Sequence, residues 1–88
     1  MELLPGTLEK LAEWDKLGYK IILVTGRRES MRNVTEQQLA KVGIFYDHLI
    51  MGVGSGTRIL INDTKPDGTE TARAININRN QGINQLKL

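Results

Sequence analysis

The sequence contains no cysteine and only one histidine among its 88 residues, and aromatic residues make up just 5% of it. Without cysteine there is no disulfide framework, no thiolate zinc site and no thiol nucleophile. Basic residues do not form a run interleaved with aromatics, so the composition predicts no nucleic-acid surface. No apolar run approaches about 20 residues, which predicts no membrane-spanning segment. The Leu3-Leu4 pair is too short for a signal peptide, and we therefore expect a cytoplasmic protein.

The remaining composition is ordinary for a globular protein, with 40% hydrophobic and 25% charged residues. The formal net charge of +2 is small and indicates no strongly acidic or basic partner. The length suits one small domain, at a size where a single core is only marginally adequate. Because there is neither an internal repeat nor a linker, the sequence predicts a single domain over residues 1–88.

Helical and strand patterns alternate along the first part of the chain. They predict a helix beginning at Pro5 or Thr7 and ending at 17, a strand over 19–25, a helix over 31–41 and a strand over 48–51. Ser30 is the expected N-cap of the second helix, and Gly18 and Gly43 are expected to end the two helices as C-terminal caps. Strands that alternate with helices indicate an α/β fold with a mostly parallel sheet.

A third aliphatic run, Ile59-Leu60-Ile61, predicts a buried strand over 59–62. The run is followed by Asp63 and, after Lys65-Pro66, by Asp67. Open α/β sheets bind ligands at the carboxyl ends of their strands. Two carboxylates near lysine and arginine side chains would suit Mg²⁺ and a phosphate together. The same residues also fit an ordinary polar turn, and this alternative stays open.

The rest of the chain offers weaker patterns. Residues 72–77 alternate as a last strand, but only eight residues separate Asp63 from Ala72. A parallel crossover needs about a dozen or more, so the direction of this strand stays open. The tail over 78–88 is rich in Asn and Gln and predicts weak order, with a turn of helix near Ile83.

The glycine-rich segment 52–57 superficially matches a dinucleotide-binding loop. Position 57 is Thr where that motif requires Gly, and a strand is expected to resume at Arg58. No room is left for the helix whose N-terminus would bind the pyrophosphate. We therefore interpret the segment as a connector whose backbone N–H groups could face an anion.

Two of these features occur together in one known superfamily. An aliphatic strand ends at Thr25, and a later one ends at Asp63, with Asp67 four residues beyond it. This order and spacing resembles the haloacid dehalogenase-like (HAD) hydrolase superfamily, over about residues 3–77. The resemblance implies a three-layer α/β/α sandwich, a reduced Rossmann-like core. No insertion between Thr25 and Asp63 is large enough for a cap domain.

The resemblance also implies a function and roles for particular residues. It implies a Mg²⁺-dependent phosphatase of small phosphorylated metabolites, in which the Thr25 hydroxyl holds the phosphoryl group, with Gly26 and Arg27 beside the substrate. Asp63 and Asp67 would hold Mg²⁺. The phosphate charge would be offset by Arg58 or by Lys65, and the sequence does not choose between them.

One motif of the family is missing. Its nucleophile is the first Asp of an Asp-x-Asp motif at the end of the central strand, and these 88 residues contain no Asp-x-Asp. As written, the chain is expected to form no aspartyl-phosphate, and whether it is an enzyme stays uncertain. It could be a fragment, the product of a late start codon, or a natural non-catalytic relative. A phosphate-binding or regulatory module and an assembly subunit are the alternative functions.

The missing strand has a consequence for assembly. In the family that strand lies between the strand ending at Thr25 and the strand ending at Asp63. Without it, the edges at 21–24 and 59–61 would be left with unpaired backbone groups, which are costly when buried. Exposed edges of this kind pair with other chains. The chain would have to pair the two edges directly, borrow a strand from a copy of itself, or aggregate. Of these outcomes, the sequence predicts a homodimer.

Overall fold

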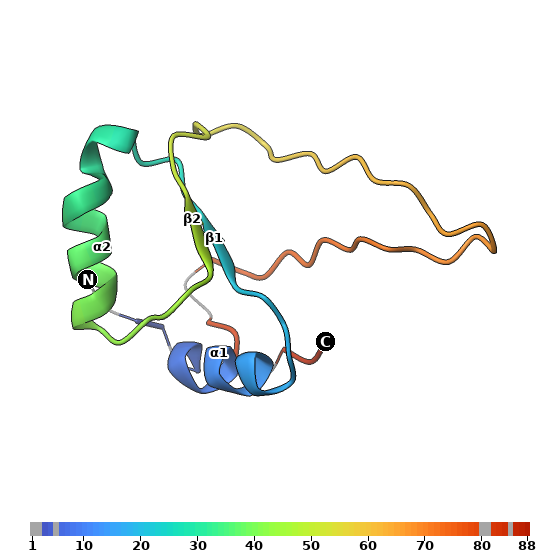
Figure 1. Ribbon diagram of the computed structural model, residues 1–88, viewed down its shortest axis with the longest axis horizontal. Coiled ribbons are helices and arrows are strands. Elements are labelled where there is room, and N and C mark those ends of the chain that lie inside the picture. The colour runs from blue at the N-terminus through green and yellow to red at the C-terminus, as the bar shows by residue number, and fades with distance from the viewer. Residues whose placement is uncertain (1–2, 5, 80–81, 85) are drawn as a thin grey trace.

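A computed structural model describes residues 3–4, 6–79, 82–84 and 86–88. Its elements, in chain order, are α1 (Thr7–Lys16), β1 (Ile22–Val24), the 3₁₀ helix η1 (Glu29–Met31), α2 (Arg32–Lys41) and β2 (His48–Ile50). Figure 1 shows the helices around the small sheet, and a long loop that leaves the sheet after β2 and then returns. We call this loop, residues 53–79, the arm.

The first helix begins and ends as the sequence predicts. At its start the Thr7 hydroxyl donates a hydrogen bond to the Leu4 carbonyl oxygen, 2.8 Å away. Leu11 is the buried residue of α1. Gly18 follows the helix with a φ of 92°, a left-handed conformation that costs glycine little and ends the helix. The predicted helix and its terminating glycine are both confirmed.

The second helix is also confirmed, but its predicted cap is wrong. Ser30 lies inside η1, and the residue that precedes α2 is Met31, which makes no side-chain capping hydrogen bond. A 3₁₀ turn occupies the position where the cap was expected, and its Met31 N–H bonds to the Arg28 carbonyl. Short 3₁₀ turns of this kind are frequent at helix N-termini.

The sheet consists of β1 and β2 in parallel, with Leu23 opposite Leu49. At one end the Asp47 carboxylate accepts the Ile21 N–H at 2.7 Å. At the other end the Thr25 N–H donates to the Ile50 carbonyl at 3.0 Å. The buried side chains are few, and they come from both helices and both ends of the sheet: Leu11, Ile21, Thr35, Leu39 and Met51. The predicted α/β class and parallel pairing are confirmed.

The prediction of a buried strand over 59–62 is wrong for this structure. Ile59, Leu60 and Ile61 are 82%, 75% and 91% exposed, and the structure assigns no strand to the arm, including the predicted strand at 72–77. An aliphatic run is buried only when another element pairs with it and covers it. Among the described residues, no element does so for 59–61.

The arm gives the molecule an elongated shape. It reverses at a turn in which Lys65 N–H bonds to the Thr69 carbonyl at 2.9 Å, and the limb beyond this turn runs back to the sheet (Figure 1). The radius of gyration is 14.7 Å, against about 12 Å for a compact domain of this length. In the described residues, no helix has the length and apolar character needed to cross a membrane.

The described residues of the tail form a turn near Ile83, and no helix is assigned to them. The Leu86 N–H bonds to the Ile83 carbonyl at 3.0 Å. Part of the predicted segment, at 80, 81 and 85, lies outside the described residues.

Candidate functional site

The carboxyl ends of β1 and β2 meet at one edge of the sheet because the strands are parallel. The loops that follow them are joined by backbone hydrogen bonds. The Gly52 N–H donates to the Arg27 carbonyl at 2.7 Å, and the Val53 N–H lies 3.5 Å from the Thr25 carbonyl oxygen. This edge, formed by residues 25–27 and 51–56, is where an open α/β sheet places its ligand.

Thr25 is the half-buried polar side chain at this edge. Its hydroxyl oxygen accepts the backbone N–H of Arg27 at 3.2 Å. A hydroxyl carries one donor and two acceptor sites. Because the Arg27 bond uses an acceptor site, the hydroxyl hydrogen stays available to an anion. The geometry therefore suits contact with a phosphoryl oxygen.

Gly26 lies where the two loops touch. A Cβ built on Gly26 would lie 2.6 Å from the carbonyl oxygen of Gly54, closer than real Cβ atoms approach. The absence of a side chain therefore lets the loop after β1 pack directly on the loop after β2. Gly54 itself has a φ of 80°, a left-handed conformation that favours glycine.

Arg27 is anchored to the second helix. Its Nη1 donates to the Thr35 hydroxyl at 3.0 Å and to the Gln38 side-chain oxygen at 2.8 Å. Thr35 is buried, so this contact ties the loop after β1 to the interior. The predicted contact of Arg27 with a substrate stays a prediction, and the structure gives the side chain this anchoring role.

The other predicted site residues lie on the arm. Arg58, Asp63, Lys65 and Asp67 are all exposed. Figure 1 shows the turn of the arm at the end farthest from the sheet. The structure therefore gathers Thr25, Gly26 and Arg27 at the sheet edge, and it does not bring the arm residues to them.

Asp67 has its own partners within the turn. Its carboxylate accepts the Thr69 N–H at 2.9 Å. The Thr69 hydroxyl, and after it the Thr69 N–H, lower the pKa of Asp67 below its usual value because they stabilise the charged carboxylate. A second network lies beside it, where the Thr71 hydroxyl donates to the Asp63 carbonyl at 2.6 Å. The turn therefore stabilises the charged form of the exposed Asp67 carboxylate.

The acids of the arm have the right chemistry for Mg²⁺, which prefers carboxylate oxygens and retains several waters. Within the part of the chain that the structure describes, no three His, Cys, Asp or Glu residues gather into a metal-binding group. The arm therefore offers Asp63 and Asp67 as two carboxylate donors, and the described residues gather no third His, Cys, Asp or Glu with them.

A comparison with protein-family models places these features in a family. Residues 1–73 match the model of HAD superfamily, subfamily IIIB (acid phosphatase). The chain belongs to the HAD superfamily. The match includes both helices, both strands and the outgoing limb of the arm, so it contains Thr25, Asp63 and Asp67. No curated protein and no solved structure matches the chain.

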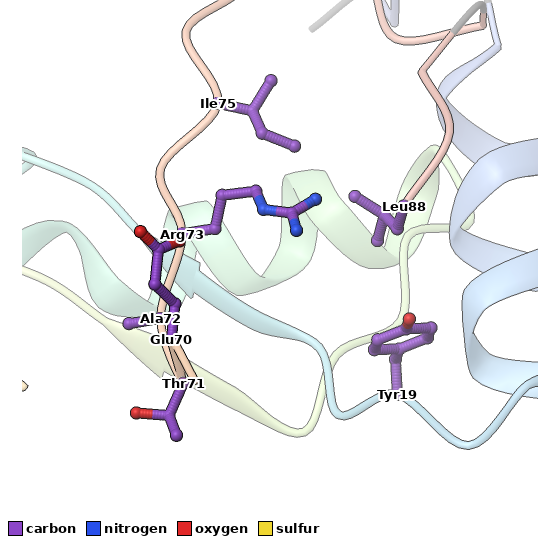
Figure 2. A pocket seen from close by; sticks show the side chains of 7 residues that line it. All are labelled: Tyr19, Glu70, Thr71, Ala72, Arg73, Ile75 and Leu88. Atoms are coloured by element: carbon purple, nitrogen blue, oxygen red, sulfur yellow. The ribbon is translucent and has the colours of Figure 1, made fainter. Parts of the chain in front are cut away.

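A cavity that the sequence did not predict lies elsewhere in this HAD-superfamily chain. It has a volume of about 340 Å³ and lies between Tyr19, the returning limb of the arm and Leu88. Figure 2 shows the Arg73 side chain reaching across it from the limb. Tyr19 precedes β1, so the cavity lies toward the amino end of the strand. None of the predicted site residues lines it, and no local pattern could reveal it, since it forms where distant segments meet.

Proposed function

We propose that this chain supplies the phosphoryl-binding and Mg²⁺-binding groups of a phosphatase that acts on small phosphorylated metabolites. The observation that carries the proposal is Thr25, placed at the carboxyl end of β1 with its hydroxyl oriented by the Arg27 N–H. The HAD family match spans this residue and supports the phosphatase class.

In this proposal the Thr25 hydroxyl donates to a phosphoryl oxygen, and the Gly26 backbone lies beside it. Asp63 and Asp67 hold Mg²⁺, which neutralises charge on the phosphoryl oxygens when it is bound. Arg58 or Lys65 offsets the remaining charge. Hydrogen bonds and charges arranged in advance around a phosphoryl group account for most of the catalysis that such sites provide.

The proposal includes a more complete fold than the two strands of the structure. In it, helices cover both faces of the sheet as a three-layer α/β/α sandwich. The amphipathic α1 and the exposed aliphatic run at 59–61 support this arrangement. A cytoplasmic location stays a prediction from the sequence.

A non-catalytic phosphate-binding or regulatory module is the second candidate, and one observation favours it. The 88 residues contain no Asp-x-Asp, and phosphoryl transfer to an enzyme needs a nucleophile poised at phosphorus. We therefore expect this polypeptide alone to bind phosphate without hydrolysing p-nitrophenyl phosphate. Mg²⁺-dependent turnover that disappears in Asp63→Asn would overturn that expectation. If the chain is instead an assembly subunit whose catalytic strand comes from another chain, mixing the two chains should produce turnover.

An NMR titration tests the phosphate site. Millimolar phosphate with Mg²⁺ should shift the amide signals of Gly26 and Arg27, and Mg²⁺ should shift that of Asp63. Thr25→Val removes the hydroxyl and should weaken phosphate binding by about tenfold, because a hydrogen bond to a charged group contributes about 1.5–3 kcal/mol. Thr57→Val is the matched control, since Thr57 is an exposed threonine on the arm. Signals that do not move would refute the phosphate site.

A further inference from the structure

Among the residues that the structure describes, no strand lies beside one edge of β1. The Thr25 N–H bonds to the Ile50 carbonyl, and the His48 N–H bonds to the Ile21 carbonyl, so the backbones of Ile21 and Thr25 face β2. Backbone groups in a parallel pair alternate in direction along the strand. Those of Ile22 and Val24 therefore point to the opposite edge. Both side chains are about half exposed, at 52% and 47%.

The returning limb of the arm passes near this part of the sheet but does not pair with it. Figure 1 shows the last part of the returning limb reaching the sheet. Among the described residues, no backbone hydrogen bond joins the limb to Ile22 or Val24. An unpaired edge with aliphatic side chains is a template for another strand.

The same chain carries a segment that fits this edge. Residues 59–61 are three consecutive aliphatics that lie outside any helix or strand and are 75–91% exposed. Their side chains have high strand propensity. Each copy of the chain thus offers one free edge and one free aliphatic segment, and two copies can satisfy each other reciprocally.

The exposed surface area of the chain supports an interface with a second copy. The chain exposes 7481 Å², whereas a compact monomer of 9.9 kDa is expected to expose about 5,200 Å². The excess is about 2,300 Å² for each chain, or about 4,600 Å² for two chains. Obligate homodimers bury about 2,000–5,000 Å² in total. The excess therefore matches what a second copy of this chain would cover.

We propose that residues 59–61 of one copy add as a parallel strand to the free β1 edge of a second copy, and that the same residues of the second copy add to the free β1 edge of the first. The two chains then share two composite sites, each formed by residues from both chains. In the aligned register Ile59 lies opposite Ile22 and Ile61 opposite Val24. Asn62 of one copy then lies opposite Thr25 of the other, and Asp63 follows directly. Adjacent strands lie about 4.8 Å apart, so an arm acid of one copy reaches the phosphate-binding threonine of the other.

Charge favours the parallel direction. Parallel addition brings Asp63 to the loop that carries Arg27 and Arg28, where the acid meets basic residues. The antiparallel direction would place Arg58 beside those arginines and move Asp63 to the amino end of β1. The exchange of arms stands independently of the proposed phosphatase function, whereas the composite site rests on it.

Mass measurement tests the exchange. Light scattering on a size-exclusion column should give twice the 9.9 kDa mass of the chain at micromolar concentration. Leu60→Lys places a charge in the exchanged segment and should halve that mass. Because Leu60 is exposed, the variant should keep the circular dichroism of the parent. Thr57→Lys, on the same limb, is the control and should stay dimeric. A monomeric parent protein would overturn the proposal.

Disulfide mapping tests the direction. The chain has no cysteine, so a Val24→Cys protein can be mixed with a differently tagged Ile61→Cys protein and oxidised. Parallel addition places the Cα atoms of these positions about 4.8 Å apart, inside the Cα separation of about 4.4–6.8 Å that a disulfide spans. The Val24→Cys and Ile61→Cys mixture should give a cross-linked heterodimer in greater yield than Val24→Cys with Ile59→Cys.

A higher yield from the Ile59 mixture would show antiparallel addition and overturn the composite site. No heterodimer in either mixture would overturn the exchange itself. Neither measurement uses phosphate or Mg²⁺. Failure here is therefore distinguishable from failure of the proposed function, which would show as unmoved amide signals in the titration.

Discussion

Gly26 occupies a position where any side chain would separate the two loops of the candidate site. A Cβ there would meet the Gly54 carbonyl oxygen at 2.6 Å, a backbone atom that cannot move independently of its loop. We expect Gly26→Ala to destabilise the protein by about 1–3 kcal/mol through overpacking. Urea unfolding measures the change.

Gly56→Ala is the control for this substitution. Nothing lies within 4 Å of a Cβ built on Gly56, and its φ is not positive. Alanine there restricts the unfolded chain without a clash, so its unfolding midpoint should stay level or rise slightly. If both variants lost the same stability, contact between the loops would not be the reason for glycine at 26.

The carboxylate of Asp67 gives the turn of the arm a pH dependence. The Thr69 hydroxyl and N–H lower the pKa of Asp67 in the folded state. A lowered folded pKa means that the stabilisation is present above the unfolded pKa and is lost as pH falls through the folded pKa. We expect Thr69→Val to raise the pKa of Asp67 toward its usual value, measured by carboxyl-carbon NMR.

Thr64→Val is a suitable control, because it removes a threonine hydroxyl from the same arm and leaves Thr69 in place. The Asp67 titration should be unchanged in that variant. An unchanged titration in Thr69→Val as well would show that the hydroxyl does not bond to the carboxylate in solution. The Thr69 N–H would then be the principal donor.

At the level of helices and strands, Arg32 connects α2 to the sheet. It forms ion pairs with Glu29 and Glu36, and its Nη2 donates to the Leu49 carbonyl of β2 at 3.0 Å. The neighbouring Glu29 carboxylate raises the pKa of Arg32, so the guanidinium stays charged. A single side chain thus links the start of the helix to the middle of a strand.

We expect Arg32→Lys to lower the thermal unfolding midpoint, because lysine cannot contact two carboxylates and a carbonyl with one planar group. Arg28→Lys, at an exposed position before η1, should change the free energy of unfolding by less than about 0.5 kcal/mol. Thermal unfolding of both variants tests these two expectations. Equal stability of the two would mean that the Leu49 contact contributes nothing measurable.

The local elements could be predicted from the sequence because their signals are local. Both helices carry spaced apolar residues and end at Gly18 and Gly43, whose left-handed backbone the structure confirms. The strand before Thr25 was also predicted. The run at 59–61 carries an equally strong pattern, yet it is exposed, because burial depends on a neighbouring strand that the pattern does not contain.

At the scale of the whole molecule, part of the candidate site can also be predicted from local patterns, and part of it depends on contacts between distant segments. The meeting of Thr25 and Gly26 with the loop after β2 follows from parallel pairing, which alternating strands and helices predict. The position of Asp63 relative to Thr25 depends on where the arm lies. No local pattern in the sequence determines that position, since it is set by contacts between segments far apart in the chain or between chains.

Exchange of arms between two copies makes stability depend on concentration. If folding and association are coupled, a tenfold increase in protein concentration stabilises the folded dimer by about 1.4 kcal/mol. With a urea dependence of about 2 kcal/mol per molar, the unfolding midpoint should rise by about 0.7 M per tenfold increase in protein concentration. Leu60→Lys should abolish this dependence, and Thr57→Lys should keep it. A parent midpoint that stays constant from about 1 to 100 μM would show that the chain folds without its partner. The exposed aliphatic run at 59–61 would then not contribute to folding through a second copy.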